Sequence, residues 1–454
     1  MHEILPRHET KTIETEPMNV LIGVQNLAAE RLAGTEHYVL SLAQELAALG
    51  ADVTVVAPAP GKGTRMEDFG GVKIRYFGDG SAPTKGEILG QDEPRFLDEF
   101  ASILRETKAD LFHLHSSSSV MGIAHQRLAK AAGIKTVISL HVPGWFCARY
   151  DFMFEGKRQC DATLRSGKCN RCAAKQRFGP LKGAVLASAA EMSGLKRAPI
   201  FRSLNAGTSK LDSLREHFLL ADVVHVFADW QKEIMLRSGF REASVFLSRQ
   251  GVREDFVNVD EDGAADHPGD APIKVGFCGR INEIKGVNVL LKAISATDRK
   301  DIEFTIVGEP RDSIADKVQD LTIHGRTVAC VGTLRGKDLV DWYQQMDVIC
   351  APSHCAETGP LVVMEAQALG KPVIASRLGG NAELISEHEN GFLFDTGDDR
   401  QLAEVFAILT KETLQAMGAK SSYDRTMATV AGELMAEYAR VLMAIEPDTT
   451  VGSR

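Results

Sequence analysis

The sequence lacks a long apolar run, an excess of positive charge and an N-terminal signal pattern. No stretch approaches the ~18 to 20 consecutive apolar residues that a helix needs to cross a bilayer. The formal net charge of −9, with 61 acidic residues against 52 Lys and Arg, argues against a nucleic-acid-binding protein. Residues 1–17 are polar and have no apolar centre, so we expect a disordered tail and a cytoplasmic protein.

Length and composition indicate a globular chain with two domains. Its 454 residues exceed what one hydrophobic core usually organises. It is 44% hydrophobic and 25% charged, as ordinary globular proteins are. In a cytoplasmic chain, eight cysteines favour free thiols or a metal site over a disulfide framework.

The first half of the chain alternates β-branched runs with segments of helical apolar spacing. The expected strands are Met18–Val24, Val53–Ala57, Asp110–His115, Thr136–Leu140 and Ala221–Phe227. The expected helices are Tyr38–Leu49, Ala124–Ala132 and Trp230–Ser238, with Gly34, Thr35 and Glu36 in the loop before the first of them. This alternation predicts a parallel sheet with helical crossovers.

A second set of alternating segments follows residues 259–272, which are acidic, glycine-rich and typical of a linker. Its expected strands are Ile273–Cys278, Ile302–Val307, Val348–Ala351 and Pro372–Ala375, and Gly286–Ile294 is an expected helix. We therefore predict Rossmann-like domains over 18–258 and 273–400, with helices over 401–454. Ligands of such sheets bind beyond the carboxyl ends of the strands, so a cleft between the domains is the expected active site.

The segment 353–376, SHCAETGPLVVMEAQALGKPVIAS, contains the clearest local signals. Pro360 suits the first position of a helix, because its missing N–H is not needed there. Gly370 fits a left-handed helix cap, and Pro372 prevents extension. Glu357 is therefore expected in the loop before the helix and Glu365 within it.

The start of this helix is predicted to bind a phosphate group. The N–H groups of residues 358–362, Pro360 excepted, point out of the helix start, where partial positive charge gathers. The contacting residues are expected to be Gly359, Pro360, Leu361 and Val362. Carboxylates accept hydrogen bonds from hydroxyl pairs, so Glu357 is predicted to hold a sugar and Glu365 a ribose. For an isolated pair at this spacing, a capping glutamate and a surface acid would be the better interpretation.

The segment closely resembles the E-x7-E signature of the retaining GT-B glycosyltransferases of family 4. Other matching pieces occur in the family's order and cover most of the chain: Gly34-Thr35-Glu36, Gln250-Gly251-Val252, Gly279-Arg280, Lys285-Gly286, Ile306-Val307-Gly308-Glu309, Val331-Gly332, Tyr343, Asp347, Gly379-Gly380, Glu383 and Asn390-Gly391. The resemblance implies two Rossmann-like domains that face a cleft, with C-terminal helices that cross back to the N-terminal domain. A membrane-docking role for the Met-rich C-terminal helices is the less favoured alternative.

The resemblance also implies roles for particular residues. Gly34 and Thr35 correspond to the glycine-rich first loop, and Gly279 and Gly308 to strand ends near the nucleotide. Arg280 and Lys285 resemble the pair that holds the donor diphosphate, where they would stabilise the charge that develops on the β-phosphate; a solvated basic pair is the alternative. His141 matches a histidine near the donor sugar, and a packed histidine is the alternative.

The implied function is a retaining transfer of a hexose-type sugar from a UDP- or GDP-linked donor to an acceptor hydroxyl, without a catalytic divalent metal. Alternatives are a GT-B sugar-nucleotide epimerase or phosphorylase, and a non-catalytic nucleotide-sugar-binding scaffold. The acceptor stays open among glycans, lipids and small metabolites, as do peripheral membrane contact and the oligomeric state. His113 and His115 are assigned equally to the acceptor side and to a structural role.

Four cysteines lie in an insert, residues 144–200, that is rich in Arg, Lys and Gly and poor in apolar periodicity. A long loop with little core needs an added constraint to hold one shape. Zinc is predicted to supply that constraint, bound by Cys147, Cys160, Cys169 and Cys172. An iron–sulfur cluster and free or redox-active thiols are the alternatives. Buried thiols are expected for Cys278, Cys330, Cys350 and Cys355.

Overall fold

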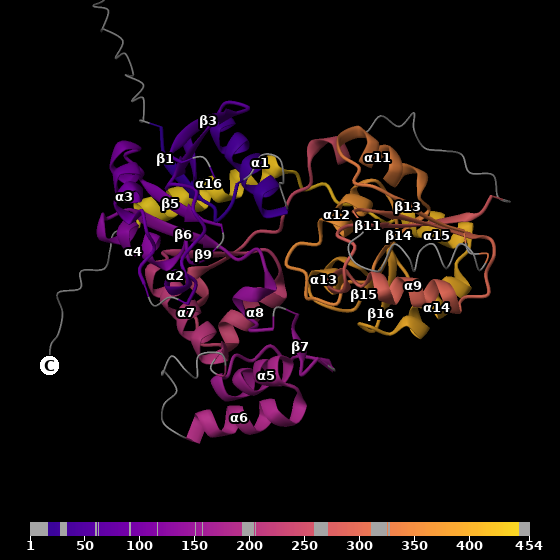
Figure 1. The fold of residues 1–454 in the computed structure, drawn as a ribbon. Helices are drawn as coiled ribbons and strands as arrows, with labels where there is room; N and C mark the ends of the chain where they lie inside the picture. The colour runs from indigo at the N-terminus through magenta and orange to yellow at the C-terminus, as the bar shows by residue number, and fades with distance from the viewer. Residues whose placement is uncertain are drawn as a thin grey trace, which may run out of the picture.

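The protein has two lobes, each built on a largely parallel sheet (Figure 1). The computed structural model describes residues 17–27, 34–59, 61, 63–89, 92–115, 117–149, 151–156, 158–192, 204, 206–257, 271–309, 325 and 327–444. The predicted tail and the predicted linker therefore fall almost wholly outside the described residues. No helix among the described residues is long and apolar enough to cross a membrane.

The N-terminal sheet has eight strands in the order β10-β9-β6-β5-β1-β2-β4-β3. Their bounds are β1 (Asn19–Gly23), β2 (Asp52–Pro58), β3 (Arg65–Phe69), β4 (Val72–Phe77), β5 (Leu111–Leu114), β6 (Lys135–Ser139), β9 (Val223–Val226) and β10 (Val245–Leu247). All neighbours are parallel except β3 and β4. The sequence analysis missed this hairpin because the edge strand β3 is exposed along most of its length and has no apolar run.

The C-terminal sheet has six parallel strands in the order β13-β12-β11-β14-β15-β16. Their bounds are β11 (Ile273–Cys278), β12 (Ile302–Val307), β13 (Thr327–Val331), β14 (Val348–Ala351), β15 (Val373–Ser376) and β16 (Gly391–Phe394). The strand order reverses between β1 and β5 in the first sheet and between β11 and β14 in the second. Two doubly wound domains, as predicted, are confirmed, and each reversal marks the place where ligands of such sheets bind.

Helices flank both sheets, and one of them, α1, begins earlier than the sequence predicted. Their bounds are α1 (Gly34–Ala48), α2 (Lys85–Leu89), α3 (Leu97–Glu106), α4 (Ile123–Ala131), α7 (Ala206–Leu220), α8 (Asp229–Arg237), α9 (Val287–Ala296), α11 (Gly336–Gln345), α12 (Leu361–Ala368), α13 (Gly380–Leu384), α14 (Asp399–Ile408), α15 (Lys411–Gly418) and α16 (Met427–Met443). Gly34, Thr35 and Glu36 form the first turn of α1 instead of a preceding loop. The acidic Glu36 suits that place, since negative charge is favoured at a helix start.

The C-terminal helix α16 crosses back to the N-terminal lobe, as predicted (Figure 1). Val430, Leu434 and Tyr438 are fully buried in the core that α1 and the first sheet share. The apolar face of α16 is thus covered by protein, as the packed role predicts. The chain crosses between the lobes beside Val252, whose N–H donates to the Arg425 carbonyl at 2.9 Å.

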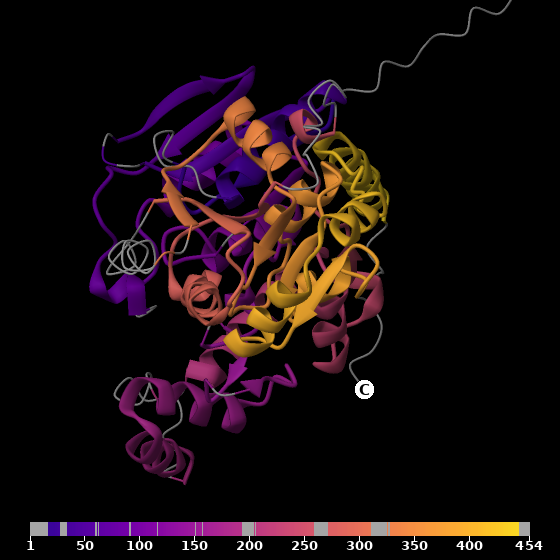
Figure 2. The same ribbon diagram turned by 90° about the vertical axis from the view of Figure 1, so that its right-hand side faces the viewer.

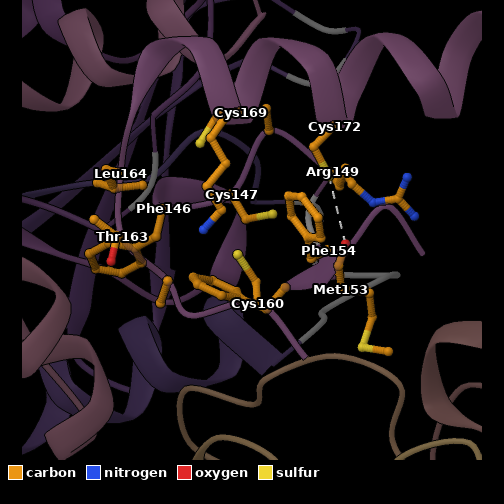
Figure 3. Close-up of a pocket in the computed structure, with 14 residues that line it drawn as sticks. Phe146, Cys147, Arg149, Met153, Phe154, Cys160, Thr163, Leu164, Cys169 and Cys172 are labelled. Carbon is orange, nitrogen blue, oxygen red and sulfur yellow. Dashed lines mark hydrogen bonds between the residues drawn. The ribbon is translucent and has the colours of Figure 1, made fainter. Parts of the chain in front are cut away.

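The cysteine-bearing insert is folded, not an irregular loop. It contains a small hairpin of β7 (Met153–Phe154) and β8 (Arg158–Gln159) and two helices, α5 (Ser166–Phe178) and α6 (Pro180–Met192). In Figures 1 and 2 these helices lie at one end of the molecule, apart from both sheets, and α5 covers the thiols of Figure 3. The helices pack through small residues: a Cβ on Gly183 would lie 2.4 Å from the carbonyl oxygen of Ala174. Such packing leaves no stripe of large apolar residues in the sequence.

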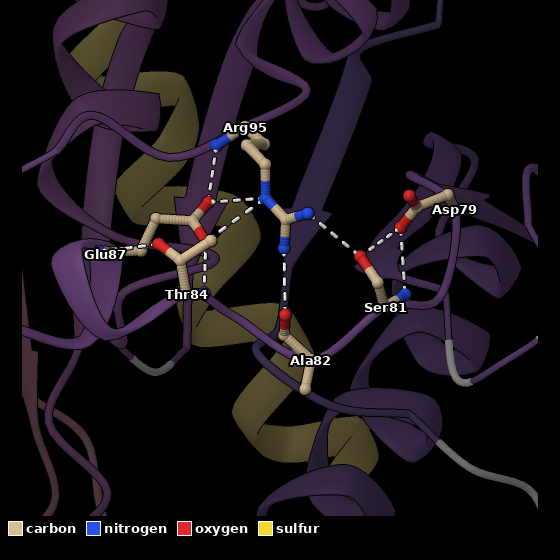
Figure 4. A network of polar contacts seen from close by, with 6 residues as sticks. All are labelled: Asp79, Ser81, Ala82, Thr84, Glu87 and Arg95. Carbon is tan, nitrogen blue, oxygen red and sulfur yellow. Dashed lines mark hydrogen bonds and ion pairs between the residues drawn. The ribbon is translucent and has the colours of Figure 1, made fainter.

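A buried carboxylate organises the segment around α2 (Figure 4). Glu87 accepts the N–H of Thr84 at 2.6 Å, and the Thr84 hydroxyl accepts the N–H of Glu87 at 3.1 Å, which makes a capping box. Arg95 donates its backbone N–H at 2.8 Å and its guanidinium at 3.2 Å to Glu87. Burial opposes ionisation of Glu87, but these donors outweigh it and lower its pKa to about 2.

We expect Glu87→Gln to lower the free energy of unfolding at pH 7 by about 1–3 kcal/mol, because buried donors lose a charged acceptor. The pKa of Glu87 falls from 4.5 to about 2 on folding, so this stabilisation is complete above pH 4.5 and is lost as the pH falls towards 2. Denaturant unfolding between pH 3 and 7 measures it. The control is Glu106→Gln, which removes a 56% exposed partner of Arg75 and should cost at most about 1 kcal/mol. A wild-type-to-variant difference that stays constant with pH would contradict the assignment.

Candidate active site

Two loops meet where the strand order of the C-terminal sheet reverses. One follows β11 and carries Gly279, Arg280 and the short 3-10 helix Glu283–Lys285, and the other follows β14 and leads to Glu357. β11 and β14 are paired in parallel, so both loops leave the same edge of the sheet. The loops cross closely: Gly286 has φ 75°, and a Cβ there would lie 1.7 Å from the Pro352 carbonyl oxygen.

Lys285 and Glu357 form an ion pair at this crossing. The ammonium nitrogen of Lys285 lies 2.6 Å from Oε1 of Glu357, and the Ser353 hydroxyl donates to the same oxygen at 2.8 Å. The side chains are only 27% and 14% exposed. Burial opposes charge on both groups, but their attraction raises the pKa of Lys285 and, with the Ser353 bond, lowers the pKa of Glu357. Both are therefore charged at neutral pH.

Arg280 adds a second cation beside this pair. Its side chain is exposed and has no carboxylate partner within the part of the chain that the structure describes. It lies close enough to oppose the positive charge of Lys285. The site therefore has two cations for one paired carboxylate, which leaves positive charge available for an anionic ligand.

Glu365 lies inside α12 and faces α11, where the Tyr343 hydroxyl donates to its Oε2 at 2.9 Å. Burial raises the pKa of Glu365 to about 7. The helix follows the predicted outline, and Gly370 has φ 65°, but Pro360 is the N-cap and Leu361 the first helical residue. The N–H of Leu361 donates to the Gly359 carbonyl at 2.9 Å, so it is already used.

The N-terminal domain holds the Glu357 loop through backbone atoms. The Thr358 hydroxyl donates to the His141 carbonyl at 2.6 Å, and Nε1 of Trp230 donates to the Glu357 carbonyl at 3.0 Å. Glu383 of the C-terminal domain caps α8 by accepting the N–H groups of Asp229 and Trp230 at 3.0 and 2.7 Å. The position of Glu357 thus depends on how the two domains dock.

The imidazole of His141 is buried in the N-terminal domain. Its Nε2 lies 2.9 Å from Nδ1 of His115, and its ring packs against Tyr38 and Phe227. Burial lowers the pKa of His141 well below 6.5, so the ring is neutral. Its backbone carbonyl accepts the hydroxyl hydrogen bond of Thr358, in the loop that carries Glu357. A role for the ring near a sugar stays a prediction.

His113 and His115 are core residues. His113 lies 2.5 Å from the Tyr438 hydroxyl and 2.8 Å from the Ser139 hydroxyl, which links α16 to the first sheet. Both rings are fully buried, and burial lowers their pKa values well below 6.5. Of the two roles expected for His113 and His115, the structure therefore supports the structural one.

The predicted glycines fall into two groups. Gly308 follows β12 beside Gly279, and a Cβ on Gly308 would lie 2.1 Å from the Gly279 carbonyl oxygen, so both lie at the carboxyl ends of β11 and β12. Gly34 and Thr35 lie at the start of α1. One residue after that turn, His37 has its pKa lowered by burial and by the charges of Arg253 and Arg335. The start of α1 therefore faces the C-terminal domain.

The four insert cysteines line one cavity together with Phe146, Phe152 and Phe154 (Figure 3). Burial raises the pKa of Cys147, Cys169 and Cys172. As the described side chains stand, no three of His, Cys, Asp or Glu are placed to hold a metal ion. Of the other cysteines, Cys350 and Cys355 are buried as expected; Cys278 is partly buried, and Cys330 is exposed because it lies on the edge strand β13.

Comparison with known proteins agrees with this architecture. A family model described as "Glycosyl transferase 4-like domain" matches residues 33–198, and one described as "Glycosyl transferases group 1" matches residues 272–412. The two matches fall in the two domains and together span about two thirds of the chain. The chain belongs to the GT-B glycosyltransferases.

Solved GT-B structures align over nearly the full chain. Sucrose-phosphate synthase from Thermosynechococcus elongatus superposes with a TM-score of 0.64 at 18% identity, covering 93% of this chain and 99% of that one. HepE of Anabaena, solved in complex with UDP and glucose, gives a TM-score of 0.62 at 15% identity, covering 93% and 99%. At these identities the likeness establishes the fold.

Curated relatives match a shorter region. The D-inositol 3-phosphate glycosyltransferase of Saccharomonospora viridis is 33% identical over 152 residues, 31% of this chain and 35% of the relative. That of Salinispora arenicola is 31% identical over 188 residues, 36% of this chain and 42% of the relative. The chain thus aligns with well under half the length of these relatives.

For three residues that shape the candidate site, the sequence did not indicate the contacts that they make. Ser353 bonds Glu357 directly, Trp230 holds its carbonyl, and Glu383 caps α8 across the domain junction. Ser353 and Glu383 lie in segments that resemble the family, but no local pattern gave them a contact. The signal for Trp230 was its place directly after an expected strand, at the edge where ligands bind.

We expect Tyr343→Phe to raise the pKa of Glu365 further above about 7, because the phenol hydroxyl donates to the ionised carboxylate. Titration of ¹³C-labelled glutamate side chains by NMR measures this value in the folded protein. Tyr76→Phe is the matched control, since it removes a buried tyrosine hydroxyl bond in the other domain, to the Leu27 carbonyl. An unchanged Glu365 pKa in Tyr343→Phe would show that the bond does not form in solution.

Proposed function

We propose that this protein transfers a hexose-type sugar, with retention of anomeric configuration, from a UDP- or GDP-linked donor to an acceptor hydroxyl. The observation that carries the proposal is the Lys285–Glu357 pair at the strand-order reversal, with Arg280 unpaired beside it among the described residues. A charged, partly buried site with surplus positive charge suits a diphosphate that must depart as an anion. Family membership supports the same reaction class.

The donor's parts match the groups present. Arg280 and Lys285 bind the diphosphate, aided by the start of α12. Glu357 accepts hydroxyl hydrogen bonds from the transferred sugar, and Glu365 does so from the ribose. The two carboxylates differ in charge state: Lys285 keeps Glu357 charged, while burial brings the pKa of Glu365 to about 7.

In the proposed step, the bond between the anomeric carbon and the β-phosphate oxygen breaks while the acceptor oxygen bonds to that carbon on the same face. The departing phosphate takes the acceptor proton. Lys285 and Arg280 stabilise the charge that collects on the phosphate, so no divalent metal is needed for it. Lys285 and Ser353 both bond Oε1 of Glu357, which makes this carboxylate a poor covalent nucleophile and favours same-face displacement.

The acceptor has to be identified by screening candidate compounds. The matched relatives carry the name D-inositol 3-phosphate glycosyltransferase, so a phosphorylated cyclitol belongs in the first panel with polysaccharide and lipid acceptors. Thermal shift across UDP- and GDP-sugars identifies the donor first. Sugar turnover that needs no acceptor would favour an epimerase, and turnover that needs inorganic phosphate a phosphorylase.

We expect Lys285→Ala to lower kcat by a factor of about 10² to 10³, as for loss of a group that stabilises developing charge.

Glu365→Ala should weaken donor binding about ten- to hundredfold, the value of a hydrogen bond to a charged group. The matched controls are Lys292→Ala, with a side chain 70% exposed, and Glu389→Ala, also exposed. Near-normal steady-state kinetics in Lys285→Ala would contradict the donor-site assignment.

The stereochemistry provides a separate test. Proton NMR of the first-formed product from an α-linked donor should show an α-linked glycoside, because the acceptor attacks the face that the phosphate leaves. A β-linked product would overturn retention and leave the donor-site assignment intact.

A further inference from the structure

Four thiols from three separate segments converge in the insert. Cys147 follows the 3-10 helix Pro143–Trp145, Cys160 follows the β7–β8 hairpin, and Cys169 and Cys172 lie on α5. Residues three apart on a helix share a face, so the last two thiols point the same way. All four line a cavity of about 30 Å³ (Figure 3). That volume admits a guest of about the size of a water molecule or a single ion.

Hydrogen-bond donors and cations surround these sulfurs. The backbone N–H of Glu155 donates to Sγ of Cys172 at 3.1 Å, and the N–H groups of Arg149 and Phe152 are directed at Cys147. Lys168 is paired with Asp161, the residue next to Cys160. Zinc binding would replace the protons of these thiols, because cysteine binds a metal as the thiolate.

The insert differs in charge from the rest of the chain. Residues 144–200 contain 11 Lys and Arg against four Asp and Glu, whereas the whole chain has a net charge of −9. Four thiolates around one divalent zinc ion leave two negative charges in excess. A locally basic segment offsets that excess, which a redox pair of neutral thiols would not require.

Aromatic rings connect this cavity to the donor-site loop. Phe146 and Phe152 line the cavity, and each packs edge-on against Trp230 with ring centroids 5.8 and 5.1 Å away. Nε1 of Trp230 donates to the carbonyl of Glu357 at 3.0 Å. Two layers of side chains, the phenylalanine rings and then Trp230, therefore lie between the cavity and the backbone of the loop that holds Glu357.

We propose that Cys147, Cys160, Cys169 and Cys172 bind one structural zinc ion that positions Trp230, and through it Glu357. The sulfurs share one cavity but do not stand at coordinating positions, so binding draws them inward. Their place on a loop end, a hairpin end and one helix face allows that movement. The zinc site stands independently of the catalytic assignment, whereas the positioning role rests on the proposed transferase function.

Metal analysis of tag-free protein tests the site directly. We expect about one zinc per chain, its loss to a chelator with release of protons, and a thiolate-to-cobalt absorption band after cobalt replacement. Cys160→Ser and Cys169→Ser should each lose the ion, while Cys330→Ser, at an exposed cysteine of the other domain, should keep it. Folded wild-type protein with less than about 0.1 zinc per chain would overturn the proposal, as would stoichiometric iron or a disulfide between these cysteines.

The positioning role has its own readouts. Removing zinc from the wild type should change the tryptophan fluorescence and lower turnover with the identified donor, and returning zinc should restore both. In Trp230→Phe, which keeps the ring packing and loses the N–H donor, zinc removal should lower turnover less than in the wild type. Equal losses in both proteins would overturn the positioning role alone. If no donor is turned over, zinc content and fluorescence still decide the metal site.

Discussion

The geometry of the candidate site depends on a charged glutamate held between two domains. The carboxylate of Glu357 is paired with Lys285 of its own domain, and its carbonyl is bonded by Trp230 of the other. A mostly buried charge is strongly destabilising without its partner, so the ion pair fixes the crossing of the two donor-side loops. Domain docking fixes the backbone of the same residue. The geometry of the candidate site therefore depends on the arrangement of the two domains.

Much of the fold was predictable from the sequence because parallel strands covered on both faces give continuous apolar runs. Strands such as β11 and β12 were identified with their observed bounds. Two parts were not predictable for physical reasons. The edge strand β3 is polar and exposed, and the helices α5 and α6 meet through alanine and glycine, so neither gives a periodic pattern of large apolar residues.

The candidate site also has one part that was predictable from the sequence and one part that was not. Pro360 and Gly370 mark the two ends of the helix in the sequence. They place Glu357 before the helix and Glu365 within it. Trp230 lies 127 residues before its partner Glu357, and His141 lies 217 residues before Thr358. These contacts exist only because the two domains dock. No pattern within either segment indicates its partner, so the structure was needed to find them.

The crossing of α16 into the N-terminal lobe gives the chain two connections between its domains, and they run side by side. Val252 on the outward path is bonded to Arg425 on the return path, in a parallel bridge with Thr426 as its other member. Two adjacent tethers permit rotation about their common line and resist sliding or twisting. A rotation of that kind would separate the bonds of Trp230, Thr358 and Glu383, which hold the two domains together around Glu357.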